Sequence, residues 1–179
     1  MTTQYLLDEQ IDRVLAALTP SNELVCRVCL RTGLRVSDVL ELRPWQIQRR
    51  VWVTEKKTGK RKQIGFPDDL GAAILRQSSE NWAFPSPKDP KKHRTRQAVW
   101  KDIKRAAAAF RLPQNAGTHS MRKVYAVELM KKYGNIERVR KALNHDRYTT
   151  TMIYAMADKL MDTKPKRHPY RKRKPAVDG

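Results

Sequence analysis

Acidic residues and long apolar runs are both scarce in this chain of 179 residues. The 18 Asp and Glu residues stand against 38 Lys and Arg, which leaves a formal net charge of +20. Such an excess indicates a polyanionic partner, with nucleic acid as the first candidate and an acidic membrane surface as the second. No run of 18 or more apolar residues occurs, so we expect no bilayer span. The N-terminus lacks a basic segment followed by an apolar one, so we expect no secretory signal and a protein that stays where it is made.

Cysteine is equally rare. Cys26 and Cys29 form a C-x-x-C in the apolar segment 24–30, and no second cysteine pair follows. A zinc site needs four ligands, and a redox site has different flanking residues. We therefore expect two buried, inert helix cysteines and no metal.

Hydrophobic periodicity predicts an α+β fold, mainly α-helical with a small antiparallel β-hairpin. The hairpin is expected from period-two segments at 51–54 and 61–67 on either side of a Lys-Thr-Gly turn. Helices are expected at residues 7–18, 22–31, 36–42, 68–77, 95–110, 118–133, 136–143 and 149–160. Asp8, Asp68, Thr118 and Asn135 are the expected N-terminal caps. Residues 1–163 are predicted to form one domain, and residues 164–179 a basic tail that is disordered until a partner orders it.

Basic side chains gather in two irregular segments. The hairpin tip is rich in lysine, which is usual for a solvated loop but also suits a DNA groove. The segment 86–96 cannot pack a core, and we expect it to be either mobile or in contact with phosphate. The predicted DNA-contacting residues are Lys56, Lys60, Lys62, Lys91, Lys92, Arg94, Arg96 and Lys123.

A second group of residues suggests chemistry. Arg35 opens a predicted helix, where a positive charge opposes the helix dipole, and Asp38 lies one turn on to hold its guanidinium. His119 and Arg122 share one helix face at i and i+3, which places two phosphate-binding groups side by side. His145 and Tyr154 follow nine positions apart. Taken singly, each has an ordinary explanation as a surface, capping, loop or half-buried aromatic residue.

Taken in order, these motifs resemble the tyrosine recombinase family, which includes the phage integrases and Xer-like site-specific recombinases, over about residues 6–160. The similar elements are Gly33-Leu34-Arg35 with Asp38, the hairpin lysine Lys57, the H-x-x-R box of His119 and Arg122, Leu143-Asn144-His145, and the segment ending at Tyr154. Five elements in this order are specific, whereas any one of them is weak.

The resemblance implies a DNA strand-breaking and rejoining enzyme. Tyr154 is then the nucleophile of a covalent 3′-phosphotyrosine, and Arg35 and Arg122 clamp the non-bridging phosphate oxygens. Lys57 protonates the leaving oxygen, His119 is its acid-base partner, and His145 donates a hydrogen bond to the phosphate. Neither a metal nor a nucleotide cofactor is needed. The implied partner is double-stranded DNA, bound by a homotetramer in the cytoplasm of a prokaryotic or phage-infected cell, at the nucleoid.

Some features depart from the family pattern or leave alternatives open. Asn144 stands where the family has glycine, which raises a question about the turn before His145. Lys57 is preferred to Lys56 because it directly precedes the Thr-Gly turn. The chain begins close to the first helix of the catalytic domain, so we expect either a short recombinase or a fragment, with a separate DNA-binding domain or accessory protein. Type IB topoisomerase-like DNA relaxation and a non-cleaving DNA-binding regulator are the alternative functions.

Overall fold

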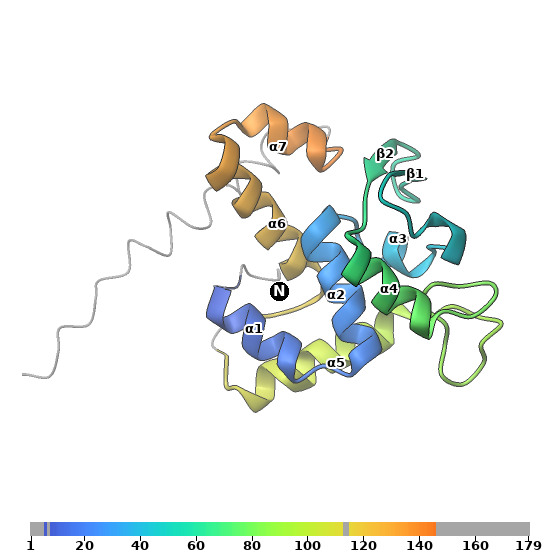
Figure 1. The fold of residues 1–179 in the computed structure, drawn as a ribbon. Coiled ribbons are helices and arrows are strands. Elements are labelled where there is room, and N and C mark those ends of the chain that lie inside the picture. The colour runs from blue at the N-terminus through green and yellow to red at the C-terminus, as the bar shows by residue number, and fades with distance from the viewer. Residues whose placement is uncertain (1–5, 7, 113–114, 146–179) are drawn as a thin grey trace, which may run out of the picture.

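The computed structural model describes residues 6, 8–112 and 115–145 (Figure 1). The predicted final helix with Tyr154, and the predicted basic tail, lie outside the described residues. The elements are α1 (Asp8–Ala16), α2 (Pro20–Thr32), α3 (Val36–Leu40), the 3-10 helix η1 (Pro44–Gln46), β1 (Val51–Thr54), β2 (Arg61–Ile64), α4 (Asp68–Gln77), α5 (Arg96–Ala109), α6 (Thr118–Tyr133) and α7 (Ile136–Ala142). This mainly helical architecture with a small antiparallel sheet confirms the predicted fold class.

Helix α2 forms the centre of the core and packs against α1, α3, α4, α5 and α6 (Figure 1). Its start is tied to α5, because the carboxylate of Asp102 accepts hydrogen bonds from the Thr19 N–H at 2.9 Å and from Asn22 Nδ2 at 2.8 Å. Cys26 and Cys29 are buried along α2, and burial raises the pKa of Cys26 to about 12. Burial raises the pKa of Cys29 as well, which favours the unreactive thiol form of both side chains. Their burial confirms the predicted place of both cysteines in the core.

The β-hairpin pairs Val51 with Ile64 and Val53 with Lys62 in an antiparallel register. Val53 and Ile64 are buried, whereas Trp52 and Arg61 on the opposite face of the pleat are exposed. Because side chains alternate along a strand, Lys62 shares the inward face with these apolar residues. Glu55 directly follows β1, and the same alternation places its side chain on the buried face of the hairpin.

Helix starts differ from prediction at several places. Helix α2 begins at Pro20, two residues before its predicted start, and Asp8 is the first residue of α1 instead of its cap. Thr118 is the first residue of α6 and Gly117 is its N-cap, with the Gly117 N–H donating to Ser120 Oγ at 3.1 Å. Asp68 likewise begins α4 after Pro67 instead of capping it. The Asn135 cap of α7 is confirmed, since its side chain accepts from the Arg138 N–H at 3.1 Å. A side-chain oxygen one residue away can satisfy the same free N–H groups, so periodicity alone does not fix the first residue.

Candidate active site

A pocket of about 240 Å³ lies where the hairpin tip meets the beginnings of α3, α5 and α6. Its lining residues are Arg35, Val36, Ser37, Lys57, Arg96, Thr118, His119 and Arg122. Four of the six predicted catalytic residues thus line one pocket, although they come from segments far apart in the chain. Arg96, predicted only as a DNA contact, lines it as well.

Helix α2 ends in a left-handed turn at Gly33, and this turn directs the chain so that Arg35 lines the pocket. Gly33 has φ +67° and its N–H donates to the Cys29 carbonyl at 2.8 Å. A Cβ at Gly33 would lie 2.3 Å from ring atoms of Tyr125 on α6. Both the positive φ and the close approach of that ring require glycine here. The chain then leaves the turn with Arg35 as the N-cap residue of α3.

Glu55 is a site residue that the sequence analysis missed. Its carboxylate is fully buried behind the pocket, where Oε2 accepts from Arg35 Nη1 at 2.7 Å and Oε1 lies 3.6 Å from Arg122 Nη1. Thr58 Oγ1, at the hairpin turn, donates to Oε2 at 3.0 Å. Burial alone would raise the pKa of Glu55, but the Arg35 hydrogen bond and the two arginine charges outweigh it and lower that pKa. One available signal was that Glu55 is the sole acid between Arg50 and Pro67.

Arg122 joins three parts of the fold. Its side chain is only 4% exposed, and it donates to the carbonyls of Gly33 and Leu143. Asp38 supports the same region, because its Oδ1 accepts the Lys56 N–H at 3.0 Å and its Oδ2 lies 3.9 Å from Arg35 Nη1. The two arginines are therefore held in place by buried partners instead of being free in solvent.

Asn144 takes the backbone conformation that glycine would adopt before His145. It has φ +51°, and asparagine tolerates this left-handed region better than most residues. The Asn144 N–H donates to the Lys141 carbonyl and the His145 N–H to the Arg140 carbonyl, each at 3.1 Å, which closes a Schellman motif after α7. His145 lies two residues beyond Leu143, whose carbonyl contacts Arg122, but it is not among the residues that line the pocket.

The electrostatics of the pocket favour an anion. Four basic side chains line it, those of Arg35, Lys57, Arg96 and Arg122, and α5 and α6 both begin there. Helix N-termini carry partial positive charge and free N–H groups, which suits phosphate. Desolvation by the pocket walls, followed by the charges of Arg96, Arg122, Arg35 and Lys123, lowers the pKa of His119. Its imidazole is therefore neutral at pH 7 and able to accept a proton.

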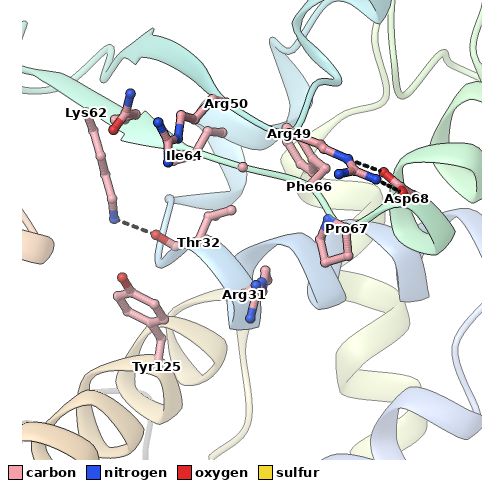
Figure 2. Close-up of a pocket in the computed structure, with 12 residues that line it drawn as sticks. Arg31, Thr32, Arg49, Arg50, Lys62, Ile64, Phe66, Pro67, Asp68 and Tyr125 are labelled. Atoms are coloured by element: carbon pink, nitrogen blue, oxygen red, sulfur yellow. Dashed lines mark hydrogen bonds and ion pairs between the residues drawn. The ribbon is translucent and has the colours of Figure 1, made fainter.

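Lys62 occupies a different place from the one predicted for it. It lines a larger pocket of about 620 Å³, together with residues such as Arg31, Thr32 and Tyr125. Figure 2 shows its ammonium donating to the Thr32 carbonyl. The ammonium lies 5.1 Å from the Tyr125 ring centre, and burial is the main cause that lowers the pKa of Lys62 to about 7. Thr32 directly precedes Gly33, so Lys62 contacts the back of the turn that carries Arg35. We therefore remove Lys62 from the residues predicted to contact DNA.

The other predicted DNA contacts are mostly surface cations. Lys56 forms an exposed ion pair with Glu41, and Lys60, Lys91 and Lys92 are exposed. Arg94 and Lys123 are half-buried, and burial lowers the pKa of each. Among residues 6, 8–112 and 115–145, no group of three or more His, Cys, Asp or Glu side chains gathers to hold a metal ion.

The fold is also found in solved structures of integrases and site-specific recombinases. The catalytic domain of bacteriophage HP1 integrase matches with a TM-score of 0.66 and 22% identity, over 95% of this chain and 100% of that one. The XerH site-specific recombinase bound to difH substrate, in a post-cleavage complex, matches with a TM-score of 0.69 and 19% identity, over 90% and 52%.

The sequence comparison identifies the family. A sequence model of the phage integrase family matches residues 4–161, and the chain belongs to this family. The integrase of Escherichia phage P2 is 30% identical over 154 residues, which are 86% of this chain and 43% of that protein. The chain thus spans less than half the length of this relative. No helix in the described part is long and apolar enough to cross a membrane.

Proposed function

We propose that this chain is a catalytic domain that cuts and rejoins double-stranded DNA at specific sites through a covalent 3′-phosphotyrosine on Tyr154. The observation that carries the proposal is the pocket in which Arg35, Lys57, His119 and Arg122 meet at the beginnings of α5 and α6. Membership of the phage integrase family supports it, as does the likeness to a recombinase solved in a post-cleavage complex.

The proposed reaction exchanges one phosphodiester for another. The Tyr154 hydroxyl attacks phosphorus, a Tyr Oη–P bond forms, and the bond from phosphorus to the 5′ oxygen breaks. Tyrosine has an ordinary pKa near ~10, so its proton needs an acceptor, and the neutral His119 is the group in the pocket that fits this role. Lys57 gives a proton to the leaving 5′ oxygen. The bond energy stays in the phosphotyrosine, so a free 5′ hydroxyl can reverse the reaction.

Arg35 and Arg122 act on charge that develops during the step. Negative charge grows on the non-bridging oxygens as the tyrosine attacks, and guanidinium groups bind such oxygens in a fork geometry. Glu55 holds both guanidiniums from behind, so little reorganisation is needed when the phosphate arrives. His145 does not line the pocket in the structure, and its proposed role is to donate a hydrogen bond to the phosphate once DNA is bound.

DNA would lie across the surface around the pocket. The proposed contacts are the exposed cations of the hairpin tip and of the loop before α5, together with Arg94, Arg96 and Lys123. Such contacts to the phosphate backbone position a duplex but do not read its sequence. Site choice therefore depends on further contacts, for which a separate DNA-binding domain or accessory protein is proposed.

The test is to recover the DNA that becomes attached to the protein. Wild type, Tyr154→Phe and the matched control Tyr148→Phe are incubated with fragmented genomic DNA without added metal, and attached fragments are sequenced after denaturation. We expect covalent DNA adducts with wild type and Tyr148→Phe, and none with Tyr154→Phe. An adduct that persists in Tyr154→Phe rejects the nucleophile.

Two other outcomes identify the alternative functions. Relaxation of a supercoiled plasmid that lacks the recovered sequence indicates a topoisomerase-like activity. DNA binding without any adduct indicates a non-cleaving regulator.

A further inference from the structure

A second cationic pocket adjoins the candidate active site at the beginning of α5. It has a volume of about 320 Å³ and is lined by Ser86, Pro87, Lys88, Arg94, Thr95, Gln97, Ala98 and Lys101. Three of these residues are cations and none is acidic. Arg96, between Arg94 and Gln97 in the chain, lines the candidate active site instead. The two pockets therefore share the segment that starts α5.

Arg94 is the unusual residue of this second pocket. It is half-buried, and its Nε is buried without a hydrogen-bond acceptor. Burial lowers its pKa and outweighs the charge of Asp102, which raises it. No carboxylate in the described part of the chain forms an ion pair with it. A partly desolvated guanidinium that donates no hydrogen bond from Nε is unfavourable, because water is lost without replacement. A bound anion would supply the missing acceptor.

The walls of this pocket are held firmly, so the loop of residues 86–95 is not a loose basic segment. The Arg94 N–H donates to the buried Phe84 carbonyl at 2.8 Å, and the Ser86 N–H donates to the Lys92 carbonyl at 2.8 Å. Trp82 Nε1 donates to the Lys91 carbonyl at 3.0 Å, and the guanidinium of Arg43 stacks 3.5 Å from the Trp82 ring centre. The backbone that carries Arg94 is thus held in place before any ligand arrives.

We propose that the Arg94 pocket binds a phosphate of the same DNA strand whose scissile phosphate occupies the candidate active site. This inference rests on the proposed function. Residues 94 and 96 are two apart, so their Cα atoms lie within about 7 Å of each other. Each DNA strand carries one phosphate per about 3.4 Å of helix axis, so neighbours of a bound scissile phosphate must pass close to this segment. The second phosphate fixes the strand in register on Arg35 and Arg122.

The test compares charge removal inside and outside the pocket. Arg94→Gln and Lys101→Gln each remove one cation from it, and Arg94→Lys keeps the charge. The control Arg13→Gln removes a cation from α1, which lies on the opposite side of the molecule from the loop of residues 86–95 (Figure 1). Affinity for a short fluorescent duplex of arbitrary sequence is measured over a series of KCl concentrations.

We expect Arg94→Gln and Lys101→Gln each to reduce the slope of log K against log [KCl] by about one, and Arg13→Gln to leave it unchanged. Equal slopes in all three variants overturn the proposal. If Arg94→Gln fails to fold, Lys101→Gln decides the question, because Lys101 is exposed and has no structural role in the core.

A direct measurement uses the Nε–H signals of ¹⁵N-labelled arginine. The Arg94 Nε–H signal, identified by its loss in Arg94→Lys, is expected to shift when the duplex is added, while that of Arg13 stays in place. A shift no larger than that of Arg13 overturns the proposal.

The outcome is separable from that of the proposed function. If Arg94→Gln and Lys101→Gln flatten the salt dependence of DNA binding but no phosphotyrosine adduct forms, the Arg94 pocket is supported as a phosphate site and the recombinase function is rejected. If an adduct forms and the salt dependence is unchanged in both variants, the recombinase function is supported and the Arg94 pocket is rejected.

Discussion

Replacing Glu55 by glutamine tests whether a buried carboxylate holds the two arginines of the pocket. The change removes one charge and little volume from a fully buried position, and leaves Arg35 and Arg122 without their shared anion. Breaking a buried ion pair from one side costs roughly 3–5 kcal/mol. Glutamine still accepts a hydrogen bond, so we expect the lower end, about 3 kcal/mol. For a chain of this length that lowers the melting temperature by about 6–12 °C.

Glu41→Gln is the matched control near the same hairpin. Glu41 pairs with Lys56 at the surface, where the two side chains are 36% and 67% exposed. Exposed pairs contribute about 0–1 kcal/mol, so this variant should unfold close to wild type. Urea unfolding of the three proteins at neutral pH measures the difference. If Glu55→Gln is no less stable than Glu41→Gln, the account of Glu55 as the anchor of both arginines is refuted.

The pH dependence gives an independent check on Glu55. Its pKa is lowered in the folded protein, so the carboxylate stabilises the fold fully above the ordinary value of 4.5, and this contribution is lost as pH falls through the lower folded value. The gap in unfolding free energy between wild type and Glu55→Gln should therefore narrow below about pH 4.5. Adduct formation by Glu55→Gln should also be slower, by about tenfold or more, because the arginines lose their fixed orientation.

Four further predictions follow from the site and the sequence. Lys62→Met should leave the salt slope of DNA binding unchanged, whereas Lys60→Met should reduce it by about one; equal reductions would place the Lys62 ammonium on DNA. The pKa of His119 is below its ordinary 6.5, so the rate of adduct formation should fall only at pH values below that, and Arg96→Gln should move this acidic limb upward; an unmoved limb argues against His119 as the acceptor. Asn144→Gly should keep the melting temperature, while Asn144→Val should cost about 1–2 kcal/mol because of the positive φ, as thermal unfolding can measure. Truncation after Thr163 removes the seven Lys and Arg of residues 164–174, and should weaken DNA binding and flatten its salt dependence.

Local patterns in the sequence predicted most of the fold. Helical periodicity located α1 to α7 to within a few residues, and the Lys-Thr-Gly turn between period-two segments located the hairpin. These features depend on neighbours in the chain, so they can be read without a tertiary structure. The order of Arg35, Lys57, His119 and Arg122 also indicated a shared site, because it resembles the order of motifs in the tyrosine recombinase family.

The tertiary structure decided which partners each charged side chain contacts. These partners are distant in the chain, so they could not be predicted from residues adjacent in the sequence. Glu55 and Lys62 look like ordinary members of a charged hairpin, yet both turn inward, one to Arg35 and Arg122 and the other to the Thr32 carbonyl. Arg94 and Arg96 lie two residues apart but line different pockets. The protonation and orientation of a charged group depend on which distant segments desolvate it and pair with it. The sequence by itself therefore determined which residue types are present and in which order. Only the packing of α2, α5, α6 and the hairpin decided which of them line the candidate active site.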